Sequence, residues 1–117
     1  MRKTIFMAAV AALAMASCAE APKTGAFNGT KGEVKLLTLD PGHFHAALVQ
    51  MYMYDQVDPT VHVYAPEGDD VQMHLDRVKM YNERSERPTS WNEQLYTGAD
   101  FLEKMIEEKK GNVVVLA

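Results

Sequence analysis

The sequence has very little cysteine: Cys18 is the only one among 117 residues. A single thiol cannot form a disulfide within the chain, so a fold that depends on disulfide cross-links is excluded. The sequence also lacks a hydrophobic run long enough to cross a bilayer. The apolar stretch at residues 5–14 is shorter than the roughly 20 residues that a membrane-spanning helix requires. A transmembrane helix is therefore excluded.

Positive charge is also scarce, because 12 lysines and arginines stand against 16 aspartates and glutamates and give a net charge of −4. Residues 1–17 contain two basic and no acidic side chains, so their removal would leave a net charge of −6. An acidic surface offers no electrostatic attraction for phosphate backbones. We therefore expect no nucleic-acid partner.

The N-terminus has the three-part layout of a secretory signal: Arg2 and Lys3, then the apolar stretch, then small residues. Residues 15–18 (Met-Ala-Ser-Cys) resemble the lipobox of bacterial lipoproteins, in which the cysteine thiol receives a lipid. We expect a signal peptide at residues 1–17, acylation of Cys18, and a flexible tether at residues 18–33. The protein would then be exported and anchored to a bilayer of the bacterial cell envelope, in the periplasm or at the outer membrane.

The rest of the chain alternates between strand and helix patterns with short connections. β-Branched and apolar runs predict strands, and apolar residues at helical spacing predict helices. The predicted strands are residues 34–39, 61–65, 94–96 and 112–116, and the predicted helices begin near residues 43, 69 and 101. This order predicts an α/β fold with a parallel sheet of about four strands and three helices covering both faces.

Several details of these elements are also predicted. The first helix should run from His43 to about Tyr54, Asp69 and Asp70 should cap the second, and residues 97–100 should form a capping box for the third, with Gly111 ending it. Residues 113–116 are continuously apolar, as in a strand covered on both faces. Because the sequence stops inside this run, we expect residues 34–117 to be the front part of a longer protein.

The first strand-to-helix turn is the predicted functional site, because parallel sheets of this kind bind ligands beyond the carboxyl ends of their strands. Glu67 lies 25 positions after Gly42, at the end of the second strand, where a carboxylate can accept hydrogen bonds from a ribose. The candidate cofactor-binding residues are Asp40, Pro41, Gly42, His43, Phe44, His45 and Glu67.

Three segments carry a resemblance to a known family: residues 37–49 (LTLDPGHFHAALV), 61–68 (VHVYAPEG) and 111–117 (GNVVVLA). Together they resemble the N-terminal domain of Gfo/Idh/MocA-type oxidoreductases, in particular an exported branch from Bacteroidetes. The resemblance implies a Rossmann domain that binds NAD or NADP, a carbohydrate or polyol substrate, and a second domain after Ala117. NAD-dependent glycosidase chemistry is known in the same family. We assign no catalytic residue, because in this family the catalytic residues follow the nucleotide-binding portion. The full-length protein could form a homo-oligomer.

The turn departs from the usual G-x-G-x-x-G/A pattern. Alignment places Asp40 at the first glycine, Gly42 at the second and His45 at the third, so only the middle position matches. The retained glycine is the one at which the backbone approaches pyrophosphate most closely. Glu67 would repel the extra phosphate of NADP, which favours NAD.

Two other classes of function remain open. His43 and His45 form a His-x-His pair, which occurs in metallohydrolases, but positions two apart on a helix face different directions. His62 and His74 lie within a strand and a helix, and we expect them to be packed or solvated rather than metal ligands. The second class is a lipoprotein that binds a carbohydrate or a partner on a Rossmann scaffold without catalysis. Glu108 and Lys109 lack the proline of the family's Glu-Lys-Pro motif and are interpreted as solvated charges.

Overall fold

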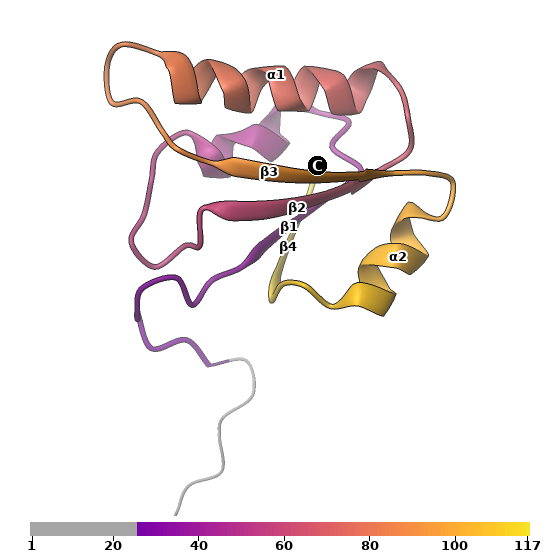
Figure 1. The fold of residues 1–117 in the computed structure, drawn as a ribbon, viewed down its shortest axis with the longest axis horizontal. Coiled ribbons are helices and arrows are strands. Elements are labelled where there is room, and N and C mark those ends of the chain that lie inside the picture. The colour runs from indigo at the N-terminus through magenta and orange to yellow at the C-terminus, as the bar shows by residue number, and fades with distance from the viewer. Residues whose placement is uncertain (1–25) are drawn as a thin grey trace, which may run out of the picture.

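A computed structural model describes residues 26–117. The predicted signal peptide and the predicted lipidation site, Cys18, lie outside the described residues. Strands and helices alternate along the chain, as predicted (Figure 1). The elements are β1 (Leu36–Leu39), the 3-10 helix η2 (Phe44–Gln50), β2 (Thr60–Ala65), α1 (Asp69–Glu83), β3 (Asn92–Thr97), α2 (Phe101–Glu108) and β4 (Val113–Leu116).

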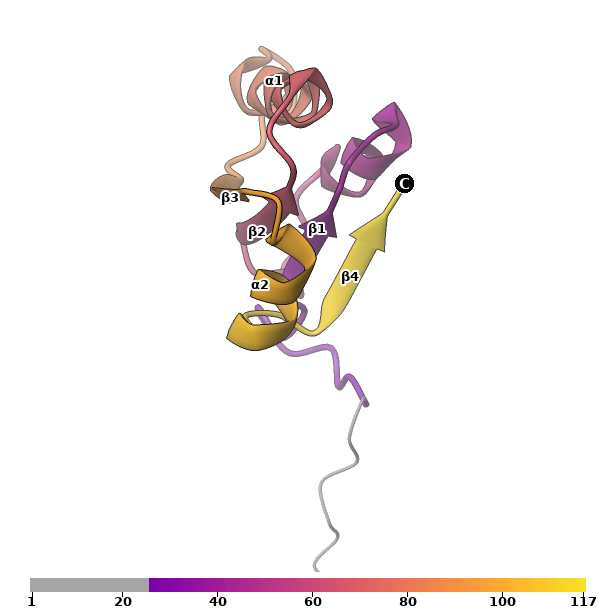
Figure 2. The ribbon, with the colours of Figure 1, turned by 90° about the vertical axis from the view of Figure 1, so that its right-hand side faces the viewer.

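The four strands form one parallel sheet in the order β3-β2-β1-β4. Strands β2 and β3 thus follow β1 on one side, and β4 pairs with β1 on its other side. This is the strand order of half a Rossmann fold. Helices η2 and α1 cover one face, and α2 covers the other (Figure 2). The predicted α/β fold with helices on both faces of a parallel sheet is confirmed.

The main core lies between the sheet and the pair η2 and α1. Alternate residues of β2 point into it, and Val61 and Val63 are fully buried. Each buried valine of this kind contributes roughly 1.5–3 kcal/mol relative to an exposed one. The largest cluster consists of Leu36, Ala47, Val61, Val78, Tyr81 and Trp91. Trp91 is buried in this cluster, and its indole Nε1 donates to the carbonyl of Gln50 at 2.6 Å.

The face of the sheet that carries α2 is less covered. This corrects the prediction that the strand at residues 113–116 is covered on both faces. Strand β4 alternates between half-buried and exposed residues, and Val114 and Leu116 are 49% and 69% exposed. Among residues 26–117, β4 is therefore covered on one face only. The physical reason is the position of α2, which packs against β2 rather than over β4 (Figure 2).

The first helix differs from its prediction in type and length. It is a 3-10 helix that ends at Gln50, not an α-helix that continues to about Tyr54. His43 stands just before it in an extended conformation, and its Nδ1 accepts a hydrogen bond of 3.3 Å from the amide of His45. After Gln50 the chain bends, because the side chain and the carbonyl of Gln50 are both bonded to the β3 region.

The predicted helix ends are also corrected. Gly68 rather than Asp69 or Asp70 is the N-cap of α1, at a φ of 149° that favours glycine, and the two aspartates lie in the first turn. Asp100 precedes α2 but makes no side-chain cap, because its Oδ1 accepts the Tyr96 hydroxyl instead. Lys109, in the left-handed conformation at a φ of 50°, ends α2 in place of Gly111.

Gly111 has a different role, which is close packing of the connection into β4 against β1. A Cβ at this position would lie 2.6 Å from Leu37 Cγ and 2.6 Å from the carbonyl oxygen of Lys35. Both distances are shorter than van der Waals contact, so only glycine fits here. Within residues 26–117, no helix is both long and apolar enough to cross a membrane.

Candidate functional site

The candidate site is a crevice at the carboxyl ends of β1 and β2, between the first strand-to-helix turn and the start of α1. It has a volume of about 280 Å³ and is lined by Asp40, Ala65, Pro66, Glu67, Gly68, Asp69, Asp70 and Val71. Ligands bind at this end of the strands in open parallel sheets, where the strand order reverses. The structure thus brings two of the predicted site residues, Asp40 and Glu67, to one crevice.

Asp40 takes a backbone conformation that favours glycine. Its φ is 48°, in the left-handed region that glycine enters freely and that aspartate tolerates better than most other residues. Its amide donates to the carbonyl of Tyr64 at 2.8 Å, which ties the turn to β2. The chain therefore turns sharply after β1 without a glycine at this position.

Gly42 keeps an open face toward the crevice. A Cβ built on it would meet only Asp70 Oδ2, at 3.8 Å, and the carbonyl oxygen of Asp40, at 4.0 Å. Neither contact is a clash, and the φ of Gly42 is not positive, so packing and backbone conformation do not require glycine here. What the missing side chain does provide is room for another molecule to approach the backbone.

The amide groups of the turn are engaged within the protein. Gly42 and His43 both donate to the carbonyl oxygen of Ala117, at 2.9 and 3.3 Å, and Ala46 donates to that of His43 at 3.1 Å. In a dinucleotide-binding turn such amides point at the pyrophosphate. Here the end of β4 already accepts hydrogen bonds from two of them.

The residue at the third glycine position, His45, does not disturb the packing of helix against strand. His45 is exposed, whereas Ala46 and Ala47, which follow it, are completely buried against the sheet. The two alanines provide the small surface that close packing needs. Close packing of η2 on the sheet therefore does not require a small residue at position 45.

His43, Phe44 and His45 form an exposed aromatic cluster at the outer end of the turn. The ring centroids of the two histidines are 4.3 Å apart, and each lies within 4.5 Å of the Phe44 ring. The expectation that the two imidazoles face different directions is wrong, because His43 precedes the helix. In the described part of the chain, no group of three His, Cys, Asp or Glu side chains is arranged to hold a metal ion.

Charge in the crevice has one sign. Asp40, Glu67, Asp69 and Asp70 contribute four carboxylates to its lining, and no lysine, arginine or histidine is among the lining residues. Sequence reasoning assigned Asp69 and Asp70 to helix capping and so missed their place at the site. The signal that could have identified them is their position directly after Glu67, at the start of the helix that faces the turn.

The residues of the crevice suit one end of a dinucleotide better than the other. The ribose end fits, since Glu67 lies at the end of β2 and lines the crevice, and the open face of Gly42 fits a close approach of the backbone. The pyrophosphate end lacks positive charge and free amides at Gly42 and His43. The site thus matches the fold and the ribose contact of a nucleotide domain but not its usual phosphate contacts.

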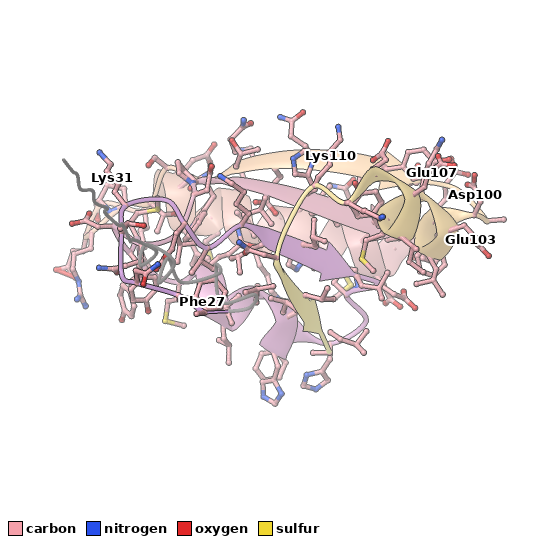
Figure 3. The ribbon with its side chains drawn as sticks, turned by 90° about the horizontal axis from the view of Figure 1, so that it is seen from below. Phe27, Lys31, Asp100, Glu103, Glu107 and Lys110 are labelled. Carbon is pink, nitrogen blue, oxygen red and sulfur yellow. The ribbon has the colours of Figure 1, made fainter. Side chains whose placement is uncertain are left out.

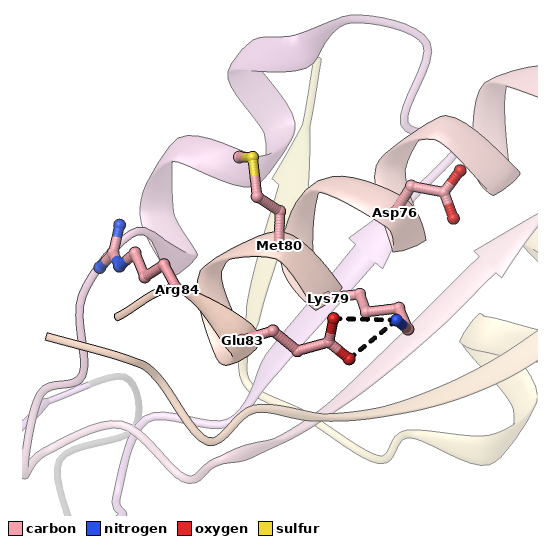
Figure 4. Close-up of a pocket in the computed structure, with 5 residues that line it drawn as sticks. All are labelled: Asp76, Lys79, Met80, Glu83 and Arg84. Carbon is pink, nitrogen blue, oxygen red and sulfur yellow. Dashed lines mark hydrogen bonds and ion pairs between the residues drawn. The ribbon is translucent and has the colours of Figure 1, made fainter. Parts of the chain in front are cut away.

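Other hollows lie away from this edge. One of about 450 Å³ on the outer side of α1 is lined by Asp76, Lys79, Met80, Glu83 and Arg84 (Figure 4). Its charges are largely satisfied locally, because Lys79 and Glu83 form an ion pair of 2.8 Å. Another, of about 490 Å³, lies at the opposite ends of the strands and includes Lys35, which is paired with Asp58 at 3.0 Å.

The two ends of the molecule carry different side chains. Asp100, Glu103 and Glu107 project from the region of α2, and Phe27 and Lys31 lie at the other end (Figure 3). Glu107 is partly paired with Lys104, at 3.5 Å. Neither end adds a cation to the crevice lining.

Comparison with known proteins found one informative similarity. The chain matches the crystal structure of a putative oxidoreductase from Parabacteroides merdae with 64% sequence identity and a TM-score of 0.74, over 75% of this chain and 20% of that one. No protein-family model matches the chain, and no curated protein matches it. The chain therefore spans about one fifth of the solved protein that it resembles, and that similarity supports the Rossmann-like fold.

Proposed function

We propose that this chain is the nucleotide-binding portion of an NAD-dependent oxidoreductase of the Gfo/Idh/MocA type that acts on a carbohydrate or polyol. The observation that carries the proposal is the placement of the Asp40–His45 turn and Glu67 at the carboxyl ends of adjacent strands. The 64% identical oxidoreductase supports the general class of reaction. NAD-dependent glycosidase chemistry is a variant of the same proposal.

In this proposal the residues of the chain bind and orient the cofactor. Glu67 accepts hydrogen bonds from the ribose hydroxyls, and its charge disfavours the additional phosphate of NADP. Gly42 allows the backbone to approach the pyrophosphate, and the buried Ala46 and Ala47 hold η2 close to the sheet. The cofactor supplies hydride transfer when bound, and the groups that position the substrate lie outside these residues.

The test is direct binding. We expect a nucleotide to co-purify with the full-length protein, seen by ultraviolet absorbance and mass spectrometry, and NAD to bind more tightly than NADP in calorimetry. Replacing Glu67 with alanine should weaken NAD binding and reduce the preference over NADP. Unchanged NAD affinity in this variant would remove the role of Glu67, and the absence of any nucleotide binding would contradict the function.

One specific observation favours a second candidate function. The amides of Gly42 and His43 are bonded to Ala117, and the crevice is acidic, so the scaffold could serve a non-enzymatic lipoprotein that binds a carbohydrate or a partner. Glycan-array binding by a protein that retains no nucleotide would support this alternative. In both cases we propose that Cys18 carries the lipid that attaches the protein to the cell envelope.

A further inference from the structure

We propose that Asp70 controls which ligands the crevice accepts: its carboxylate lies beside the open face of Gly42 and opposes phosphate binding there by charge. This inference rests on the proposed nucleotide function and deepens it. It assigns to the first turn of α1 a specificity-determining residue that the glycine pattern does not include.

The geometry places the carboxylate at the point of closest approach. Asp70 Oδ2 lies 3.8 Å from the position that a Gly42 Cβ would take, and outside residues 41–43 it is the nearest atom to that position. Gly42 stands where the backbone of a dinucleotide-binding turn comes closest to the pyrophosphate. A phosphate oxygen at that position would therefore lie beside a carboxylate oxygen of Asp70.

Nothing in the lining of the crevice compensates this charge. Its other ionisable side chains are the carboxylates of Asp40, Glu67 and Asp69. The amides of Gly42 and His43, which could have offset it, donate to Ala117. A diphosphate entering the crevice therefore meets negative charge, and two amides of the turn are already bonded to Ala117.

The position of Asp70 is also favourable for the protein itself. Asp69 and Asp70 lie in the first turn of the 15-residue helix α1, where the positive end of the helix dipole stabilises a carboxylate. The same helix end is the one that could attract a phosphate from the crevice. The Asp70 carboxylate thus interacts with the positive end of the α1 dipole, which a ligand anion could otherwise use.

The experiment compares NAD affinity in the full-length chain and in Asp70→Asn, which has nearly the same shape without the charge. We expect NAD to bind on the order of tenfold more tightly, after allowance for solvent screening of an exposed carboxylate. Asp70→Ser, which also removes the charge, should give a similar gain. Asp76→Asn, on the same helix but outside the crevice lining, is the matched control and should leave affinity unchanged.

The dependence of NAD affinity on ionic strength distinguishes an effect of the Asp70 charge from an effect of its side-chain shape. The gain in Asp70→Asn should be largest at about 10 mM salt and should nearly vanish at about 1 M, where the screening length falls to about 3 Å. Equal NAD affinity in wild type and Asp70→Asn at low salt, or a gain that persists at high salt, would overturn the inference.

The result also distinguishes this inference from the proposed function. If the wild type binds NAD and Asp70→Asn binds it equally well, the function stands and the role of Asp70 is wrong. If only the Asp70 variants bind NAD, the role of Asp70 stands and the native nucleotide function is wrong. If neither binds, both are wrong.

Discussion

The hydroxyl of Tyr64 donates a hydrogen bond of 2.6 Å to Glu108 Oε1 and thereby joins the central strand β2 to the last turn of α2. Tyr64 is almost completely buried. Glu108, interpreted from the sequence as a solvated charge, thus has a structural partner. Since hydrogen bonds to charged acceptors are among the stronger ones, this bond holds α2 on a face where the helix buries none of its own residues.

The first prediction concerns this bond. We expect Tyr64→Phe to lower the free energy of unfolding by about 1 kcal/mol, measured by urea denaturation. Tyr96→Phe is the matched control, because its hydroxyl bonds to Asp100 at the exposed surface; that change should have a smaller effect. Equal effects of the two substitutions would contradict the structural role of Glu108.

The hydrogen bond between Tyr64 and Glu108 also predicts that the free energy of unfolding depends on pH. Burial and the bond to Glu108 raise the pKa of the Tyr64 phenol well above its usual value of 10.0, and that bond lowers the pKa of Glu108 below 4.5. The contribution of Tyr64 to the free energy of unfolding is therefore complete below about pH 10. It is lost as the pH rises above 10 toward the raised pKa of the folded state. That of Glu108 is present above pH 4.5 and is lost as the pH falls through its lowered pKa. The stability difference between wild type and Tyr64→Phe should stay constant from about pH 6 to 9 and narrow above pH 10.

The second prediction concerns the two glycines. Gly111→Ala should lower the free energy of unfolding by about 1–3 kcal/mol, because the added methyl group overlaps the backbone of Lys35 and the side chain of Leu37. Gly42→Ala should leave stability nearly unchanged, because its methyl group meets only ordinary contacts. Thermal melts of the two variants check this contrast, and equal losses would show that the packing of Gly111 is not tight.

The third prediction concerns a buried polar cluster. Glu93 Oε2 accepts a hydrogen bond of 2.8 Å from Gln50 Nε2, and Glu93 Oε1 lies 3.7 Å from Nε2 of His74. Gln50 and His74 are fully buried. Glu93→Ala should therefore lower the free energy of unfolding by about 1–3 kcal/mol, since it leaves the Gln50 amide without its partner. Gln94→Ala, at the exposed neighbouring position, should have little effect in the same denaturation experiment.

The fourth prediction concerns the backbone of the turn. Asp40→Gly should maintain or raise stability, because glycine adopts the observed φ of 48° without strain. Asp40→Ala should be less stable than Asp40→Gly by about 1 kcal/mol. Differential scanning calorimetry of both variants measures the difference, and a more stable alanine variant would show that the turn is not left-handed in solution.

The fifth prediction concerns the membrane anchor. Cys18→Ala should abolish incorporation of labelled palmitate and shift the protein from the membrane fraction to the soluble fraction. Ser17→Ala, which keeps a small residue before the cysteine, should retain both properties. Palmitate labelling that survives in Cys18→Ala would place the anchor elsewhere.

The sequence by itself determined the order of strands and helices, because the apolar periodicity and the turn residues are local signals. It also located the turn at residues 40–45 and the acidic residue Glu67. It did not determine the ends of the helices, because alternative caps such as Asp69 and Gly68 differ by little free energy until the surrounding contacts are made. Gln50, the last residue of η2, likewise bonds to Trp91 and Glu93, which are distant from it in the sequence.

Only the tertiary structure decided how charge is arranged at the site. Asp40 and Asp70 are 30 positions apart in the sequence, yet the parallel pairing of β1 and β2 brings both to one crevice. The engagement of the Gly42 amide by Ala117 likewise depends on the return of β4 to the side of β1. A sequence pattern records which residues follow one another, whereas the electrostatics of a site depend on distances that the packing of the sheet sets.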